Sequence, residues 1–247
     1  MQVFIAADAA EAADKAANIV ENVVRSRPRP RLGMATGSTM VGIYQSLVGR
    51  YRAGRLSFAE TSIYLLDEYV GLDCDHPQAF RNVIKAGLAD LVDLRDDALF
   101  GPDGSSPGLE AEAQRYEQLV TEACIDIQLL GIGGNGHIAF NEPGASFEGL
   151  TSVVTLSEET RRDNARFFAS VDDVPRQAIS QGIGTILRAR AILLIALGAH
   201  KARPICDAII GPVSIESPAS AIRLHPDVSV VLDAEAASLL PAARSEG

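Results

Sequence analysis

The segment Leu129–Gly144, LLGIGGNGHIAFNEPG, carries two proton-exchanging side chains on a glycine-rich stretch that follows an apolar run. His137 is of the side-chain type best suited to moving protons near neutral pH, and a carboxylate within reach, such as Glu142, would orient the imidazole and stabilise its charged form. The glycines allow the backbone to bend sharply and to present both groups from one compact turn. A lone histidine after an apolar strand is more often structural than catalytic, so this segment alone does not establish an active site.

A second acidic position follows another apolar run. Asp67 and Glu68 come directly after Ser62–Leu66. A carboxylate at the end of a strand could serve as a general base, provided that its pKa and position suit the proton it removes. An isolated acidic pair is more often part of a solvated loop, so both interpretations stay open for this motif.

Groups that could bind a phosphate occur at three places. The tetrapeptide TGST, Thr36–Thr39, precedes a helical segment, so its backbone N–H groups, its hydroxyls and the helix dipole could all favour an anion. An ordinary helix cap explains the tetrapeptide equally well, and no lysine follows the glycine as in a Walker A loop. Lys201 and Arg166 would usually be solvated surface charges, yet both are plausible cationic partners for a phosphate.

The glycine pattern G-x-G-x-x-G also occurs, at Gly131, Gly133 and Gly136, with Glu158 about 20 residues further on as a dinucleotide site requires. Pro143–Gly144 follows too soon for the helix that binds a pyrophosphate. We therefore interpret this match as a false positive.

The scaffold for these groups is predicted from periodicity. Short runs rich in Val, Ile and Leu alternate with longer segments of helical period, which is typical of an α/β fold with helices around a mostly parallel central sheet. Helices are predicted at Ala9–Val24, where Asp8 can cap the first turn, at Met40–Tyr51, and after Gly198. The predicted strands are Gln2–Ile5, Arg31–Ala35, Ser62–Leu66, Asp126–Leu130, Ser152–Leu156, Ala191–Leu197 and Val228–Leu232.

We expect one domain over residues 1–247, because the chain has no internal repeat and no convincing linker. The RPRPR stretch at 27–31 is expected to end the first helix, and the charged tail after Pro241 is expected to be frayed. In an open sheet of this kind ligands bind outside the carboxyl ends of the strands, and the polar groups described above follow four predicted strands.

Charge and cysteine content narrow the function classes. The net charge of −10 argues against a nucleic-acid or anionic-membrane partner, so an anionic substrate would need a local cationic site. Cys74, Cys124 and Cys206 are widely spaced, which indicates neither a disulfide framework nor a cysteine metal site and fits a reducing cytoplasm. The N-terminus lacks a signal-peptide pattern and no run is long enough to span a membrane, so we expect a soluble cytoplasmic protein without a metal.

Several segments together closely resemble the glucosamine-6-phosphate deaminase family, in the family's order and across nearly the whole chain. They are LGMATGST (32–39), LLDEYVGL (65–72), GNGHIAFNEPG (134–144), TLSEETRRDNARFF (155–168), LGAHKA (197–202) and LHP (224–226). The resemblance implies a modified Rossmann-like fold and a hydrolase of amino sugar metabolism, acting in N-acetylglucosamine catabolism. Its implied reaction converts glucosamine 6-phosphate and water to fructose 6-phosphate and ammonium, with no redox cofactor and no required metal.

The resemblance also implies roles for individual residues. Asp67 corresponds to the base that removes the C2 proton and delivers it to C1. His137 corresponds to the group that opens the pyranose ring, with Glu142 as its carboxylate partner and Asn135 completing the relay. The residues that correspond to the family's phosphate-binding groups are Gly37, Ser38, Thr39, Arg166 and Lys201.

Two departures from the family pattern carry predictions. Many relatives have Asp where this chain has Asn135, and we expect the histidine relay to work with an amide there. Allosteric hexameric members use basic residues after Asn-Glu-Pro, whereas 145–156 contains no Lys or Arg. We therefore expect no activation by N-acetylglucosamine 6-phosphate, and a monomer or small homo-oligomer. Residues 156–174 resemble the family's mobile active-site lid.

Three alternatives stay open at this stage. A deaminase for galactosamine 6-phosphate would use the same chemistry at C1 and C2, because the epimeric carbon is C4. A 6-phosphogluconolactonase shares the fold and a Gly-His turn, although the IAFNEP stretch at 138–143 matches the deaminase version. A sugar-phosphate sensor without turnover would need the phosphate site but not the combination of Asp67, His137 and Glu142.

Overall fold

The structure is a computed structural model that describes residues 1–241, so the charged tail predicted to be frayed lies outside the described residues. Its centre is a sheet of seven parallel strands in the order β1-β10-β9-β6-β2-β3-β5. The strands are β1 Gln2–Ala6, β2 Arg31–Met34, β3 Ser62–Leu65, β5 Leu99–Phe100, β6 Ile127–Leu130, β9 Ile192–Ala196 and β10 Val228–Asp233. Apart from the short β5, these are strands that the apolar runs predict, with ends that differ by one residue.

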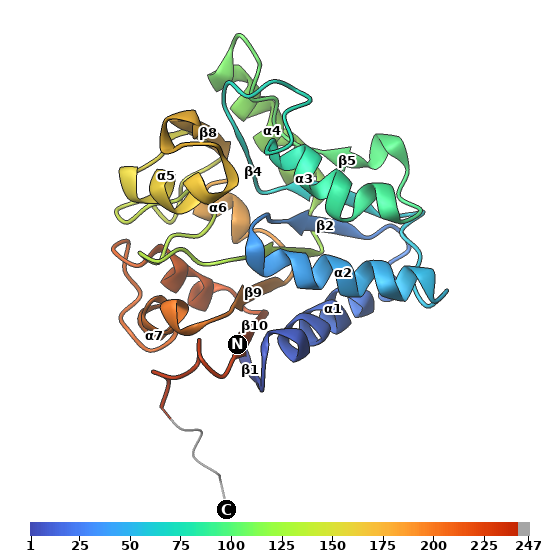
Figure 1. The fold of residues 1–247 in the computed structure, drawn as a ribbon, viewed down its shortest axis with the longest axis vertical. Helices are drawn as coiled ribbons and strands as arrows, with labels where there is room; N and C mark the ends of the chain where they lie inside the picture. The colour runs from blue at the N-terminus through green and yellow to red at the C-terminus, as the bar shows by residue number, and fades with distance from the viewer. Residues whose placement is uncertain (242–247) are drawn as a thin grey trace, which may run out of the picture.

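Helices cover both faces of this sheet. On one face α1 (Ala9–Ser26) and α2 (Ser38–Arg52) lie side by side (Figure 1). Successive residues of β3 point to opposite faces of the sheet. Ile63 packs into the main core with residues of α1 and α2, whereas Tyr64 packs against α4 on the other face. The other α-helices are α3 Phe80–Gly87, α4 Leu109–Ala123, α5 Glu158–Asn164, α6 Ile183–Ile186 and α7 Ala202–Ile209.

A second sheet sits beside the carboxyl ends of the parallel strands. It contains β4 (Asp67–Tyr69), β8 (Gln177–Ser180) and β7 (Ser152–Thr155), all antiparallel. The prediction of a strand near 152–156 is therefore confirmed, but its place in the parallel sheet was wrong. The half-exposed β7 pairs with β8, a strand that the sequence analysis did not predict.

A side-chain cap marks the start of the first helix, and a proline-rich stretch follows its end. The Asp8 carboxylate accepts hydrogen bonds from the backbone N–H groups of Ala10 and Glu11, both at 2.9 Å, as predicted. The helix ends at Ser26, before the proline-rich 27–31 stretch. This short connection returns the chain directly to β2.

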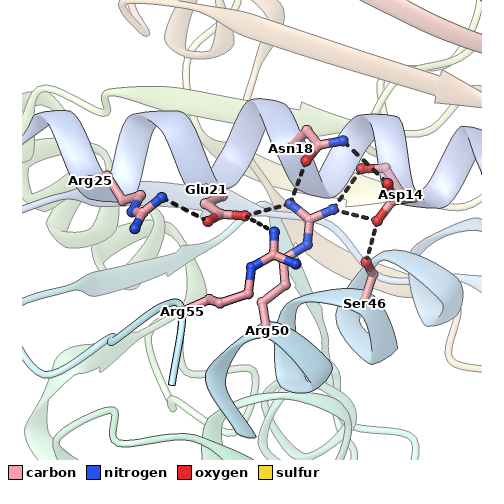
Figure 2. A network of polar contacts seen from close by, with 7 residues as sticks. All are labelled: Asp14, Asn18, Glu21, Arg25, Ser46, Arg50 and Arg55. Carbon is pink, nitrogen blue, oxygen red and sulfur yellow. Dashed lines mark hydrogen bonds and ion pairs between the residues drawn. The ribbon is translucent and has the colours of Figure 1, made fainter. Parts of the chain in front are cut away.

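The α1–α2 contact contains a buried ion-pair network (Figure 2). Arg50 of α2 is 5% exposed, and its Nη1 donates to Asn18 Oδ1 at 2.9 Å and to Glu21 Oε2 at 2.7 Å. Its Nη2 donates to the Asp14 backbone oxygen at 3.0 Å and side chain at 2.5 Å. The hydrogen bond from Arg50 lowers the pKa of Asp14.

We predict that Arg50→Met destabilises the protein by about 3 kcal/mol, because it leaves the buried Glu21 carboxylate with only the exposed Arg25 and Arg55 beside it. Urea unfolding followed by circular dichroism measures this change. Arg52→Met on the exposed side of the same helix is the matched control and should change stability by less than about 0.5 kcal/mol. Equal losses in both variants would show that the network is not stabilising.

Candidate active site

A cavity of about 430 Å³ opens at the carboxyl ends of β2, β3, β6 and β9. It is lined by seven of the nine predicted site residues: Gly37, Ser38, Thr39, Asp67, His137, Arg166 and Lys201. The remaining two, Asn135 and Glu142, lie behind the imidazole of His137 and are linked to it by hydrogen bonds and electrostatics. The structure therefore brings all nine residues into one region.

One end of the cavity is the N-terminus of α2. Gly37 is the N-cap residue and has a φ of 109°, a conformation that favours glycine. Among residues 1–241 no side chain caps this helix by a hydrogen bond, so the alternative that the TGST tetrapeptide is an ordinary helix cap is wrong. The first-turn N–H groups and both hydroxyls can therefore serve an anion in the cavity.

Two cations, Lys201 and Arg166, also line the cavity. Lys201 follows β9 in a short 3₁₀ helix, and Arg166 comes from a 3₁₀ helix after α5. Burial lowers the pKa of Lys201, an effect that the Arg166 charge reinforces and Asp163 opposes. The guanidinium of Arg166 also lies over the Phe167 ring, 4.8 Å from its centroid.

Asp67 lies in buried surroundings, contrary to the solvated-loop interpretation of the acidic pair. Its side chain is in β4, with 7% of the residue exposed, and it faces the cavity. Burial, and secondarily the charge of Glu68, raises the pKa of Asp67 to about 8. The two carboxyl groups therefore differ in environment, because Glu68 accepts hydrogen bonds from three backbone N–H groups.

Those three donors are Tyr69 at 2.9 Å, Phe80 at 2.8 Å and Arg81 at 2.9 Å. Two of them belong to the first turn of α3, so Glu68 caps that helix. Burial nevertheless raises the pKa of Glu68, and the backbone donors act against this shift. The pair thus combines a structural carboxylate with one that faces the cavity.

The orientation of the Asn135 amide follows from its neighbours. Glu142 is an acceptor when ionised, so the Asn135 Nδ2 group, at 2.7 Å from Glu142 Oε2, must donate to it. The amide oxygen then faces His137, 2.8 Å from Nδ1, and also accepts from the His137 backbone N–H at 3.2 Å. Nδ1 of a neutral His137 must therefore carry the proton, which leaves the Nε2 lone pair free.

The electrostatics around His137 favour its neutral form. Burial lowers the pKa of His137, while the charge of Glu142, 3.8 Å from Nδ1, acts in the opposite direction. Burial acts to raise the pKa of Glu142, but hydrogen bonds from Thr160, Asn135 and Ser157 and the charge of His137 together lower it. This pairing provides an imidazole that can exchange a proton next to a carboxylate whose pKa is lowered.

Two of the glycines in this turn are required by its geometry. A Cβ atom on Gly133 would lie 2.2 Å from His137 Cε1, so the bare backbone there makes room for the ring. Gly136 has a φ of 86°. The described chain from Gly131 to β7 contains no helix, which confirms that the G-x-G-x-x-G match does not begin a dinucleotide-binding helix.

The sequence analysis missed two hydroxyl groups that hold Glu142. Ser157 Oγ and Thr160 Oγ1, at the N-terminus of α5, donate to Glu142 Oε1 at 2.9 Å and 2.5 Å. The Ser157 side chain also caps α5. Their positions in TLSEET matched the family, but only the fold shows that they reach a carboxylate 15 and 18 residues away.

An aromatic wall was also missed. Tyr69 lies 4.5 Å from Phe80, 5.8 Å from Phe140 and 5.8 Å from Phe168, measured between ring centroids. All four rings line the cavity beside Asp67. Since they come from four separate elements, no spacing in the sequence indicates the cluster. The four rings give the cavity an apolar wall next to the buried Asp67.

Residues 1–241 contain no group of three or more His, Cys, Asp or Glu side chains arranged to hold a metal ion. Within the same range, none of the helices has the length and apolar character needed to cross a bilayer. The three cysteines are free thiols.

Comparisons with known proteins agree with this architecture. The chain is 46% identical to a glucosamine-6-phosphate deaminase of Beutenbergia cavernae over 242 residues, which cover 97% of this chain and 93% of that protein. It is 42% identical to a glucosamine-6-phosphate deaminase of Thermoanaerobacter pseudethanolicus, with 98% and 96% covered.

Solved structures give the same result. A monomeric glucosamine-6-phosphate deaminase superposes with a TM-score of 0.95 at 44% identity, covering 97% of this chain and 100% of that one. The 6-phosphogluconolactonase of Trypanosoma brucei has a TM-score of 0.74 at 22% identity, with 97% and 98% covered, which shows a shared fold alone. The profile of the family described as glucosamine-6-phosphate isomerases/6-phosphogluconolactonase matches residues 6–231. With that match and these relatives, the chain belongs to the glucosamine-6-phosphate isomerase/6-phosphogluconolactonase family.

Proposed function

We propose that this chain is a glucosamine-6-phosphate deaminase, which converts glucosamine 6-phosphate and water to fructose 6-phosphate and ammonium. The observation that carries the proposal is that Asp67 and His137 line one cavity together with the N-terminus of α2, Arg166 and Lys201. The volume of about 430 Å³ suits a small ligand of this kind. The deaminases at 42–46% identity support the same substrate.

Binding begins at the phosphate. The first-turn N–H groups of α2 and the Ser38 and Thr39 hydroxyls donate to its oxygens, while Lys201 and Arg166 supply the positive charge that an acidic protein otherwise lacks. Since the phosphate does not react, its binding energy serves to fix C1 and C2 against the catalytic groups.

Ring opening comes next, because a closed pyranose has no carbonyl to acidify C2. The free Nε2 of His137 takes the proton of the anomeric hydroxyl and returns a proton to the ring oxygen, which leaves C1 as an aldehyde. Glu142, through Asn135, stabilises the transient imidazolium. The hydroxyls of Ser157 and Thr160 position Glu142 for this role.

Isomerisation and deamination follow at C1 and C2. Asp67 removes the C2 proton, and the electron pair forms the C1–C2 double bond of an enolamine while the C1 oxygen takes a proton from solvent. Return of the proton from Asp67 to C1 gives the iminium ion of the ketose. Water adds to this ion at C2, and its protons pass to the nitrogen, which leaves as ammonium to give the ketose. Ionised Asp67 serves as the base, and its raised pKa favours holding the proton before delivery.

We further propose a monomeric cytoplasmic enzyme without activation by N-acetylglucosamine 6-phosphate. The monomeric deaminase at 44% identity supports the first point, and the absence of Lys and Arg from 145–156 supports the second. Residues 156–174 are proposed as a lid, because Thr160 and Arg166 in this segment line the cavity.

Incubation of the full chain with each amino sugar phosphate tests the substrate. We expect glucosamine 6-phosphate to yield ammonium and fructose 6-phosphate. We expect galactosamine 6-phosphate to yield smaller amounts of its two products, ammonium and tagatose 6-phosphate. A parallel assay with 6-phosphogluconolactone covers the lactonase alternative. Absence of ammonium with both amino sugars would overturn the proposed function.

Asp67→Asn should abolish exchange of the C2 hydrogen with solvent deuterium, because the amide cannot accept the proton. We expect kcat to fall by about 10²–10⁴-fold, with fructose 6-phosphate binding changed less than about threefold. Proton NMR in D₂O measures the exchange, and titration calorimetry measures the binding. Asp207→Asn on α7 is the control and should exchange normally. Persistent exchange in Asp67→Asn would remove Asp67 from its role.

The pH dependence should report the raised pKa of Asp67. Because the base acts when deprotonated, kcat/KM should rise with pH, reach half of its maximum near the Asp67 pKa of about 8 and level off above it. Glu68→Gln removes the like charge that contributes to this shift, so the acidic limb should move to lower pH. Substrate ionisation is the same for both proteins, so a displacement belongs to the enzyme. Superimposable limbs would contradict the assignment.

A further inference from the structure

A second cavity, of about 400 Å³, lies at the opposite edge of the parallel sheet. It is formed where β2 and β3 begin, whereas the catalytic cavity is formed where they end. Its lining residues are Arg29, Arg31, Glu60, Ser62, Tyr64 and Arg95, none of which lines the catalytic cavity.

The floor of this second cavity is fixed by regular structure. Arg31 and Ser62 are register partners at the first positions of β2 and β3, and Tyr64 follows two residues later, on the same face as Ser62. Tyr64 is stacked on Phe100 at 5.0 Å, and Arg31 Nη1 donates to the Ala123 backbone oxygen at 2.6 Å. One guanidinium and two hydroxyls are therefore held in a defined arrangement.

The charge of the lining is positive in a protein of net charge −10, because three guanidinium groups face one carboxylate. The nearby Asp126 carboxylate is already engaged by Arg27 and Arg190, each at 3.4 Å. Arg95 pairs with Asp97 at 3.2 Å, and that aspartate is 81% exposed. A local excess of positive charge of this kind attracts small anions.

Arg31 and Arg95 are partly engaged, by the Ala123 backbone oxygen and by Asp97, but other donors in the cavity are unused. Within residues 1–241, Arg29 forms no ion pair, and the hydroxyls of Ser62 and Tyr64 form no hydrogen bond. Burial raises the pKa of Tyr64, so this hydroxyl keeps its proton and can donate. Glu60 supplies an acceptor at the same cavity.

We propose that this cavity is a second binding site, specific for a phosphate group. Guanidinium forks match phosphate oxygens in a bidentate manner, and the Ser62 and Tyr64 hydroxyls add neutral donors. Glu60 faces the same space and suits a ligand hydroxyl, so a phosphate monoester of a polyhydroxy compound fits the lining better than inorganic phosphate. Such a ligand does not compete with the substrate, because the two cavities lie at opposite ends of β2 and β3.

Titration calorimetry on the full chain tests the site, with glycerol 2-phosphate and inorganic pyrophosphate as separate probes. The variant Arg29→Ala/Arg95→Ala removes two exposed guanidinium groups of the second cavity, and Lys201→Ala removes a cation of the catalytic cavity. Arg52→Ala/Arg203→Ala is the control that lowers the net charge equally elsewhere on the surface.

We expect two binding events for the wild-type protein with at least one probe. Arg29→Ala/Arg95→Ala should weaken one event at least tenfold while leaving kcat within about twofold, because the catalytic cavity is untouched. Lys201→Ala should weaken only the other event, and the control should retain both. Tighter binding of glycerol 2-phosphate at the second cavity supports a phosphate monoester as its ligand. Tighter binding of pyrophosphate there would instead indicate an inorganic ligand. One event for both probes, lost in Lys201→Ala and retained in Arg29→Ala/Arg95→Ala, would overturn the second site whatever the enzyme's substrate proves to be.

Discussion

Parallel pairing of β2, β3, β6 and β9 is the constraint on which the catalytic cavity depends. Because these neighbouring strands run in one direction, the segments that follow them leave the sheet at a single edge. Residues as far apart in the sequence as Ala35 and Lys201 thereby come to line one cavity. The opposite edge gathers the residues that precede the strands, which is why the arginine-lined cavity forms there.

Within this cavity, burial and nearby charges set the pKa of each ionisable side chain. Burial, and secondarily the like charge of Glu68, raises the pKa of Asp67, so its proton affinity is high. Lys201 and Arg166 line the same cavity and repel each other electrostatically, so an anion bound between them would relieve that repulsion. Glu142 is held ionised by neutral hydroxyl and amide donors, so its charge acts on His137 across the Asn135 amide. An amide at position 135 fixes the imidazole tautomer without adding a second negative charge.

Much of the fold follows from local pattern. Apolar runs located six strands of the parallel sheet, since buried strands read as continuous Val, Ile and Leu segments, and Asp8 marked the start of α1. The two-residue β5 carries too little pattern to detect. The sequence Asp67–Tyr69 gave no strand signal, because polar residues at a strand end resemble a loop. Pairing of Asp67 with Ser180 of β8 makes it a buried strand, and that pairing is a long-range event.

The sequence by itself determined which chemical groups the site contains: an aspartate, a histidine on a glycine-rich turn, a glutamate and the TGST tetrapeptide that precedes a helix. It also supplied the glycine that is required where the His137 ring meets Gly133. Only the tertiary structure decided that these groups line or adjoin one cavity, that burial raises the Asp67 pKa, that four aromatic rings lie beside Asp67, and that Ser157 and Thr160 donate hydrogen bonds to Glu142. The physical reason is that desolvation and hydrogen-bond geometry depend on which distant segments pack together, whereas side-chain chemistry and backbone freedom belong to each residue.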